Sequence, residues 1–167
     1  DPRTGKRRFG QIAGAGTTGV AGAFSVSDAG LLAYQTGFLV RSQLAWFDRS
    51  GNRVGTPGPT GIFNSLSLSP DASSVVYDEA DPRTGRIDLQ RFEFARGVPT
   101  RLTFHPSHDM FPIWSDDGAR IAFTSDRDGL WNVWTMKADG TDLRQLSRER
   151  QWFVNSPVWA PDGQSVY

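Results

Sequence analysis

The chain has 167 residues, and because single domains usually run to about 100–200 residues, it is one domain or a piece of one. Its 18 basic residues balance 18 acidic ones, which excludes the basic excess that favours nucleic-acid binding, so no nucleic-acid partner is predicted. It has no cysteine, which excludes a disulfide scaffold and a thiolate metal site.

Two features of the sequence concern its relation to a membrane and to a longer protein. No apolar run approaches the roughly 20 residues that a membrane-spanning helix needs, so direct membrane insertion by this segment is not predicted. The chain also begins without Met and stops inside an expected strand at Val166 and Tyr167. We therefore interpret it as a segment of a longer protein.

One short pattern occurs four times along the chain. The copies are anchored at Ser27, Ser69, Ser115 and Ala160, so the steps between them are 42, 46 and 45 residues. A period of this size, in which each unit holds several short β runs, is typical of β-propeller blades. The predicted fold class is therefore all-β, a β-propeller of four-stranded blades with about 42–46 residues per repeat. The copies read "FSVSDAGLLAY", "LSLSPDASSVVY", "PIWSDDGARIAF" and "PVWAPDGQSVY".

Each full unit predicts four strands, separated by turns rich in Asp and Gly. No segment shows a sustained helical period. In chain order, the expected strands are 23–27, 31–36, 43–50 and 52–56 in the first unit, 66–69, 74–79, 87–95 and 100–104 in the second, and 111–114, 120–125, 130–137 and 143–147 in the third.

The units divide the chain into three full blades with part-blades at both ends. Propellers usually close with about 4–8 blades, so the chain is a partial ring. A blade needs a neighbour on each face, and the expected partners are therefore the remaining blades of the propeller or a second copy. The isolated chain is expected to dimerise or aggregate. We predict a remnant of a preceding blade and a crossover at 1–23, blades at 24–60, 61–106 and 107–150, and the start of a truncated blade at 151–167.

The repeated turns place three aspartates in register. Paired carboxylates can act as acid and base. Each of these aspartates, however, belongs to a separate blade and has the same place in its turn. We therefore predict a structural function for the turn residues Asp71, Asp117, Gly118, Asp162 and Gly163, and no catalytic residue among them.

Two glycine-containing motifs resemble known sites or repeats. "GAGTTG" at 14–19 matches the phosphate-binding pattern G-x-G-x-x-G, which needs a strand before it and, in dinucleotide folds, a helix after it. Glycine-rich and then β-patterned residues follow instead, so we interpret it as a crossing between blades. "DPRTG" occurs at 1–5 and 81–85, an offset that is not a multiple of the blade step, and predicts one type of turn used twice.

Two polar clusters contain residue types that can bind metal ions. "HPSHD" at 105–109 brings His105, His108 and Asp109 together, but the aligned positions of the other units are apolar, which favours an exposed inter-blade loop. "SDRDG" at 125–129 is similar to the start of a calcium loop, yet Leu130 occupies the third ligand position. No metal site and no cofactor are predicted.

Three inter-blade loops, at 61–64, 107–110 and 152–155, lead into innermost strands at equivalent places. Propellers generally bind ligands on such loops because rigid blades hold them. Aromatic side chains beside Asn and His suit a protein or peptide ligand, although the aromatic residues could instead pack under their own loops. The predicted ligand-binding residues are Phe63, Asn64, His108, Asp109, Trp152, Phe153 and Asn155.

The repeat also resembles a known family. Its pattern P-x-W-[SA]-[PD]-D-G-x-x-I-A-F is similar to the propeller repeat of periplasmic TolB, a six-bladed family, and of prolyl oligopeptidase-type hydrolases. The succession "FSVSDAGLLAYQTG", "RGVPTRLTF" and "FPIWSDDGARIAFTSDRDG" resembles the C-terminal propeller of bacterial, notably acidobacterial, serine/threonine protein kinases. That resemblance implies a kinase domain and a transmembrane helix before an extracytoplasmic, periplasmic sensor domain.

The sequence as a whole predicts a non-catalytic binding platform. The chain contains none of the kinase motifs HRD, DFG and APE, and no G-x-S-x-G nucleophile motif. We predict a ligand- or protein-binding propeller segment of a receptor-like kinase. The alternatives are a TolB-like periplasmic interaction protein and the substrate-gating propeller of a serine peptidase.

Overall fold

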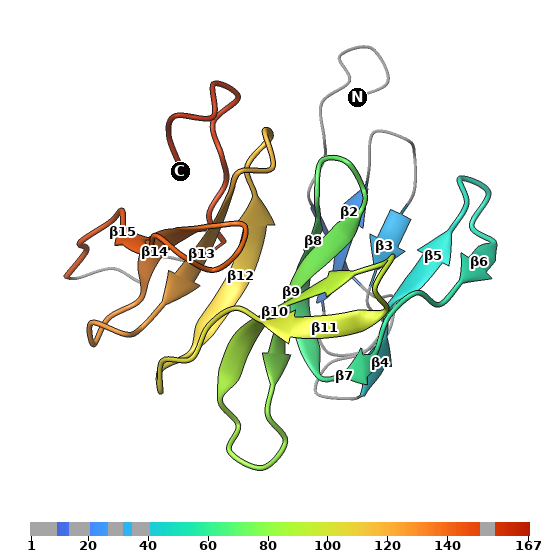
Figure 1. Ribbon diagram of the computed structural model, residues 1–167, viewed down its shortest axis with the longest axis horizontal. Helices are drawn as coiled ribbons and strands as arrows, with labels where there is room; N and C mark the ends of the chain where they lie inside the picture. Colours follow the sequence, from blue (N-terminus) through green and yellow to red (C-terminus); the bar gives the residue numbers. More distant parts are fainter. Residues whose placement is uncertain (1–9, 14–20, 27–31, 35–40, 151–155) are drawn as a thin grey trace.

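The computed structural model describes residues 10–13, 21–26, 32–34, 41–150 and 156–167, with side chains from Arg41 onward. All regular structure in these residues is β-strand. Three antiparallel sheets follow one another along the chain and lie side by side as blades (Figure 1). The predicted all-β propeller fold is confirmed. The described part of the chain has no helix that could cross a membrane.

The second and third blades are four-stranded, and their strand order follows the chain. Every neighbouring pair of strands is antiparallel. The strands of the second blade are β8 (Phe63–Leu68), β9 (Ser74–Ala80), β10 (Ile87–Glu93) and β11 (Val98–Arg101). Those of the third are β12 (Asp109–Trp114), β13 (Arg120–Ser125), β14 (Asn132–Lys137) and β15 (Arg144–Gln145).

The first sheet contains one strand more than the sequence predicts. A strand from the 1–23 segment, β1, pairs with β2 and places Gly10 opposite Phe24. The predicted blade boundaries themselves stay predictions. In order, this sheet contains β1 (Gly10–Ala13), β2 (Ala21–Val26), β3 (Leu32–Tyr34), β5 (Ala45–Phe47) and β6 (Arg53–Gly55), while β4 (Ser42–Gln43) and β7 (Thr60–Gly61) form a separate pair.

The central strand β9 serves two hydrophobic cores. Because successive side chains of a strand point to opposite faces, Val75 and Tyr77 enter one core and Val76 enters the other. The first core contains Leu44, Phe63, Leu66, Leu68, Val75, Tyr77 and Phe92. The second, between the second and third blades, contains Val76, Leu89, Leu102, Trp114, Ile121, Phe123 and Met136. Each blade is thus stabilised by its neighbour.

The repeated tryptophans contact the neighbouring blade or unit. Trp114 is only 2% exposed and belongs to the core between the second and third blades. Trp159, in the unit that follows, donates from Nε1 to the carbonyl oxygen of Ile113 at 3.4 Å. Trp114 therefore packs between two blades.

A buried carboxylate, Asp78, lies near the end of β9 and joins two blades. It accepts hydrogen bonds from the amides of Asn64 (2.7 Å), Ser65 (2.8 Å) and Phe111 (3.0 Å), and from the Ser65 hydroxyl (2.6 Å). The inner strands β8 and β12 are both bulged at these residues, and a bulge takes amides out of the ladder. Burial raises the pKa of Asp78, and the four hydrogen bonds oppose that increase.

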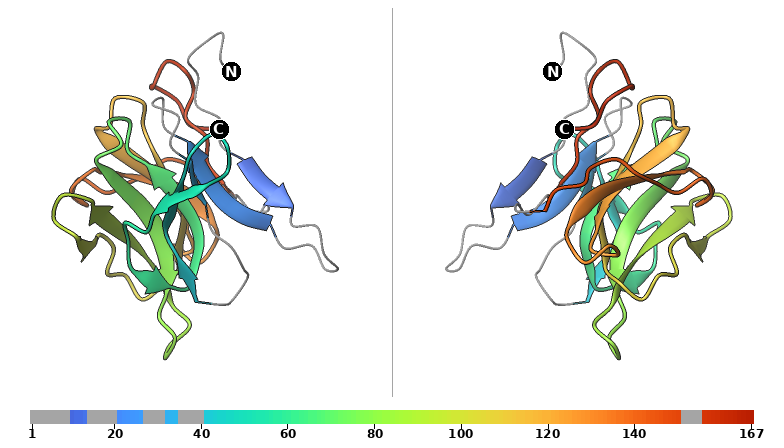
Figure 2. Two further views of the ribbon diagram at one scale, coloured as in Figure 1. Left: turned by 90° about the vertical axis from the view of Figure 1, so that its right-hand side faces the viewer. Right: turned by 90° about the vertical axis from the view of Figure 1, so that its left-hand side faces the viewer.

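The two ends of the stack of blades differ. The turns at 69–73 and 115–119 follow the innermost strands and lie at one end, which we call the turn end. The turn at 81–86 projects from the opposite end, where the segment 102–108 enters the third blade (Figures 1 and 2). We call this the loop end, and it is the end on which the sequence predicts ligand binding.

Candidate functional site

The predicted loop residues Phe63 and Asn64 belong to strand β8. Phe63 is 1% exposed, and its ring meets that of Tyr77 edge to face with centroids 4.8 Å apart. It therefore packs beneath its own loop, the alternative that the sequence left open, because the bulge after it turns the ring into the core. Asn64 is half-buried, so part of it reaches the surface of the loop end.

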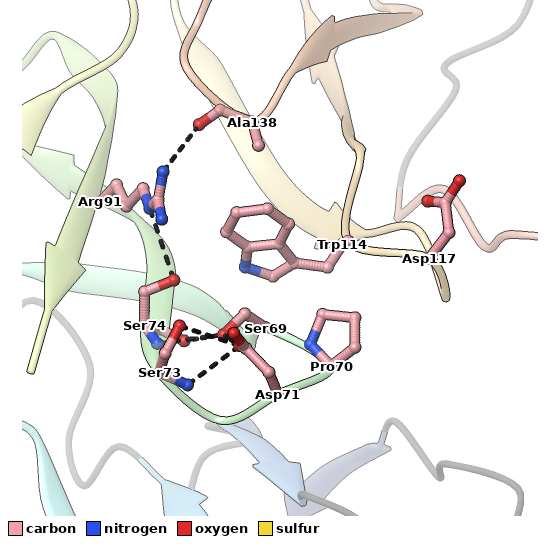
Figure 3. A pocket seen from close by; sticks show the side chains of 10 residues that line it. Ser69, Pro70, Asp71, Ser73, Ser74, Arg91, Trp114, Asp117 and Ala138 are labelled. Carbon is pink, nitrogen blue, oxygen red and sulfur yellow. Dashed lines mark hydrogen bonds between the residues drawn. The ribbon is translucent and has the colours of Figure 1, made fainter.

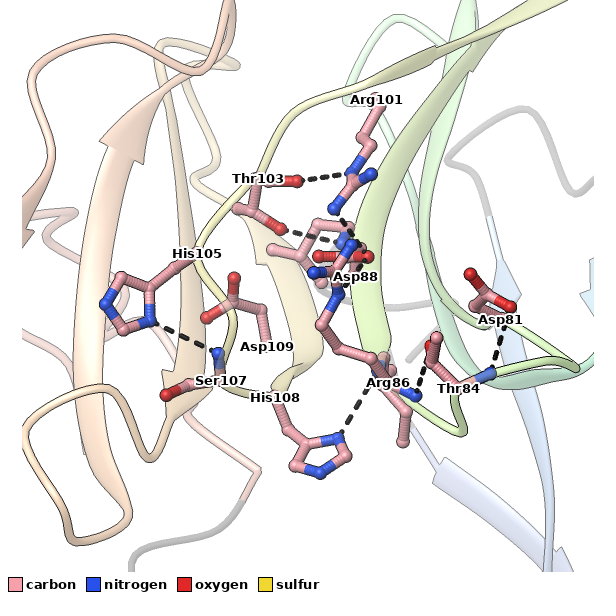
Figure 4. A network of polar contacts seen from close by, with 12 residues as sticks. Asp81, Thr84, Arg86, Asp88, Arg101, Thr103, His105, Ser107, His108 and Asp109 are labelled. Carbon is pink, nitrogen blue, oxygen red and sulfur yellow. Dashed lines mark hydrogen bonds and ion pairs between the residues drawn. The ribbon is translucent and has the colours of Figure 1, made fainter.

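His108 lies at the junction of the second and third blades. Its backbone amide donates to Asp126 Oδ1 at 2.8 Å, and its ring stacks on Trp131 with centroids 6.3 Å apart. Its Nδ1 accepts from the amide of Ile87 at 3.3 Å, which connects the third blade to the hairpin of the second (Figure 4). The ring is thus held in place, while the residue stays partly accessible.

Asp109 is fully buried and forms an ion pair. Arg127 donates to its Oδ1 at 2.6 Å, while Oδ2 has no hydrogen-bond partner among the described residues. The Arg127 guanidinium also lies 4.8 Å from the ring centre of Trp134, at a cation–π distance. Asp109 is therefore below the surface, and in this structure it holds Arg127 instead of facing a ligand.

A second buried carboxylate, Asp88, was not singled out from the sequence. Its Oδ2 accepts from Arg86 at 3.1 Å and from Arg101 at 2.8 Å, whereas Oδ1 is unpaired among the described residues (Figure 4). The only sign of this buried carboxylate in the sequence was a polar residue that alternates with apolar ones in its strand. The spacing of residues along the chain did not predict its arginine partners. The loop end thus carries paired charges.

The two histidines do not converge. The exposed His105 accepts from the amide of Ser107 at 3.3 Å, within its own loop, whereas His108 turns toward the second blade (Figure 4). The calcium-like segment also satisfies its carboxylates internally, since Asp128 accepts from Asn132 and Gln145. Among the residues described from Arg41 onward, no group of three or more histidines and carboxylates could hold a metal ion.

One large apolar side chain is conspicuous on the segment that crosses between blades. Phe104 is 72% exposed, and the Arg101 guanidinium lies 5.0 Å from its ring centre. Beside it, a hollow of about 450 Å³ runs between this crossing segment and the outer strands of the third blade, lined in part by Met136 and Leu143. We call this the crossover hollow. The sequence assigned Phe104 to a strand and so gave no signal of its exposure.

Several predicted residues lie outside the described residues. These are Trp152, Phe153 and Asn155 of the third predicted loop, together with the segments 1–5 and 14–19.

The aspartates of the turn end close their own turns. Asp71 Oδ1 accepts from the Ser69 hydroxyl at 2.6 Å and from the Ser73 amide at 3.0 Å. Asp117 Oδ1 likewise accepts from the Ser115 hydroxyl at 2.6 Å, and Asp162 Oδ1 accepts from the Gln164 amide at 2.9 Å. The next residue in each turn has a positive φ, 56° at Ala72, 68° at Gly118 and 67° at Gly163, so glycine is favoured there.

These hydrogen bonds change the acidity of the turn aspartates. The Ser69 hydroxyl, followed by the Ser73 amide, lowers the pKa of Asp71 from 3.8 to about 2. The Ser115 hydroxyl and then the Ala119 amide lower the pKa of Asp117. Both carboxylates are consequently ionised at neutral pH.

The stacked four-stranded blades, joined by a buried carboxylate and open at two ends, define a propeller scaffold. Residues 41–167 match the family described as the TolB beta propeller domain, and the chain belongs to this family.

Related proteins match parts of the chain. It is 36% identical over 109 residues to the Tol-Pal system protein TolB of Anaeromyxobacter sp. (strain K), covering 65% of this chain and 24% of that protein. It is 33% identical over 94 residues to the uncharacterized peptidase YuxL of Bacillus subtilis (strain 168), covering 56% of this chain and 14% of that protein. The chain therefore spans less than a quarter of either relative.

A solved structure supports the same fold. TolB from Acinetobacter baumannii superposes with a TM-score of 0.69 at 20% identity, covering 99% of this chain and 44% of that one. At this identity the likeness establishes the propeller fold.

The lowered pKa of Asp71 predicts an acid-dependent loss of stability. Because the folded-state pKa lies below the unfolded value, the stabilisation by Asp71 is present above about pH 4 and disappears as the pH falls toward about 2. Urea unfolding between these pH values should therefore show a smaller pH dependence for Asp71→Asn than for the wild type. Ser69→Ala should reduce it in the same direction. An unchanged pH dependence in both variants would contradict this assignment.

Proposed function

We propose that this chain is a non-catalytic part of a TolB-like propeller and binds a protein or peptide partner at the loop end and the crossover hollow. Membership of the TolB propeller family supports an interaction domain. The observation that carries the proposal is Phe104, which is 72% exposed beside an apolar hollow of about 450 Å³. A large exposed aromatic side chain next to a pocket is typical of protein-binding surfaces.

The polar surroundings of this surface suit recognition of a polypeptide. Arg101 stacks on Phe104 and shares the Asp88 carboxylate with Arg86. His108 is fixed by three contacts and remains partly exposed. A partner would meet a rigid surface with paired charges, which keeps the entropic cost of binding low.

The proposal extends to the protein that carries this domain. We propose a receptor-like serine/threonine kinase with its propeller outside the cytoplasm, because the repeat sequences resemble those of such kinases. In this arrangement the loop end would be the sensor surface. The segment would insert no part of itself into the membrane.

A second candidate host is a peptidase. The 33% identity to the uncharacterized peptidase YuxL of Bacillus subtilis favours it. In that case the propeller would control access of substrates to a catalytic domain encoded elsewhere in the protein.

Peptide binding can be tested without knowledge of the host. Peptides selected for binding to the folded chain from a displayed random library should remain uncleaved when bound. Their affinity for Phe104→Ala should be at least about fivefold lower than for the wild type, since truncating an interface anchor usually costs more than 1 kcal/mol. Val98→Ala is the matched control, because Val98 is 51% exposed on the same blade. Cleavage of the bound peptides, or equal losses in both variants, would refute the proposal.

The host can be identified from the coding sequence on both sides of this segment. Kinase motifs followed by one spanning helix upstream are the expected result. A downstream G-x-S-x-G motif would replace the kinase with the peptidase, and a signal peptide with a small α/β domain would indicate a TolB-like protein.

A further inference from the structure

A small polar cleft lies at the turn end, between the second and third blades. It encloses about 190 Å³, and its walls include Asp71, Ser74, Arg91, Trp114 and Asp117 (Figure 3). Drug-sized ligands usually occupy pockets of about 300–1,000 Å³, so this cleft has room for a single side chain. It is separated from the loop end by the length of the blades.

The wall of the cleft contains a buried donor without an acceptor. Trp114 is 2% exposed, and its Nε1–H has no hydrogen-bond partner among the described residues. In Figure 3 the nitrogen edge of the indole points toward the side of the cleft that carries Arg91 and Ser74. An unpaired buried N–H destabilises the fold, and an oxygen atom placed beside it would restore the hydrogen bond.

Arg91 lies over the ring of Trp114, and its two hydrogen bonds are long. Its Nε donates to Ser74 Oγ at 3.4 Å and its NH1 group to the carbonyl oxygen of Ala138 at 3.3 Å, both long for hydrogen bonds. The guanidinium carbon lies 5.5 Å from the ring centre of Trp114. A ligand oxygen can therefore displace these contacts and accept from Arg91 and Trp114 together.

One acceptor stands at the mouth of the cleft. Asp71 uses Oδ1 for its own turn, while its Oδ2 atom accepts no hydrogen bond from the described residues. Asp71 is exposed, and the carboxylate of Asp117 points away from Trp114 (Figure 3). A group that enters the cleft would thus find donors at the inner wall and one ionised acceptor at the mouth.

The charges restrict what can bind. Arg91 contributes one positive charge, and Asp71, Asp117 and Glu93, which lies 3.5 Å from Arg91, contribute three negative ones. This balance disfavours an anion. A lysine or arginine side chain has no acceptor for Trp114 and would meet Arg91 at the inner wall. A primary carboxamide has both a carbonyl oxygen and an NH₂ group.

The cleft is not a product of the repeat. Arg91 pairs with Val76 in the ladder of its blade, and the residue that pairs with Ala122 at the corresponding place in the third blade is Thr135. The combination of Arg91, Trp114 and the two aspartates is therefore particular to this pair of blades.

We propose that this cleft binds the carboxamide side chain of a glutamine or asparagine presented by a partner polypeptide. The carbonyl oxygen accepts from Trp114 Nε1 and Arg91, and the NH₂ group donates to Asp71. This site lies at the opposite end of the blades from Phe104 and His108, so it goes beyond the proposed loop-end function and can fail or hold independently of it.

The indole N–H of Trp114 provides a direct readout. In a ¹⁵N-labelled sample of the whole chain, its signal is assigned among the six tryptophans by comparison with Trp114→Phe. Titration with glutamine blocked at both termini should shift this signal downfield and saturate at about millimolar concentration, as expected for so small a ligand. Blocked glutamate, which has the same shape but a negative charge, should give no saturable shift at neutral pH.

Substitution of Asp71 separates binding from folding. Asp71→Asn keeps an oxygen for its turn but replaces an acceptor at the mouth with a donor, and should weaken blocked glutamine about tenfold or more. Asp162→Asn makes the same change in another turn of the repeat and should bind normally. Dispersed amide signals verify that each variant is folded.

Two results would overturn the proposal. One is a chemical shift of the Trp114 indole N–H that does not saturate as blocked glutamine is added, which would mean that the cleft holds only water. The other is an affinity for blocked glutamine that is the same in Asp71→Asn and in the wild type.

Discussion

The position of the third blade relative to the second depends on one buried carboxylate. Asp78 is 0% exposed and accepts four hydrogen bonds, two at each carboxylate oxygen. Its Oδ1 accepts from the amides of Asn64 and Ser65, and its Oδ2 accepts from the Ser65 hydroxyl and the Phe111 amide. The bulges of two inner strands leave these amides without ladder partners. A carboxylate with only donors around it satisfies them all and fixes the third blade against the second.

This junction determines what the two ends of the molecule can present. At the loop end, Asp88 and Asp109 are buried and paired with arginines. The side chains that a partner can reach there are His108 and the exposed ring of Phe104. At the turn end, the same two blades enclose the cleft between Arg91 and Asp117. A rigid frame with variable ends is how propellers separate stability from recognition, and both proposed sites lie where the second blade meets the third.

The fold could be predicted from the sequence because each repeat of the pattern corresponds to one blade. A 42- to 46-residue period, the turn aspartates and Trp114 are all local patterns, and the structure contains the corresponding blades. The sites depend on contacts between blades, which spacing does not encode. Asp78 reaches an amide 33 residues away, and Arg91 lies against a tryptophan of the next blade. For Phe63 the sequence left open whether the ring binds a ligand or packs under its own loop, because the bulge that follows it leaves no mark in the sequence.

The most direct test of this account is hydrogen exchange at the Phe111 amide in the wild type and in Asp78→Asn. If Asp78 couples the blades, the Phe111 amide of the variant will exchange about 10- to 100-fold faster relative to amides of the β13–β14 ladder, because one acceptor becomes a donor. Asp88→Asn, a buried substitution of the same kind within the second blade, should leave that ratio unchanged. A Phe111 amide that keeps its relative protection in Asp78→Asn would contradict the account.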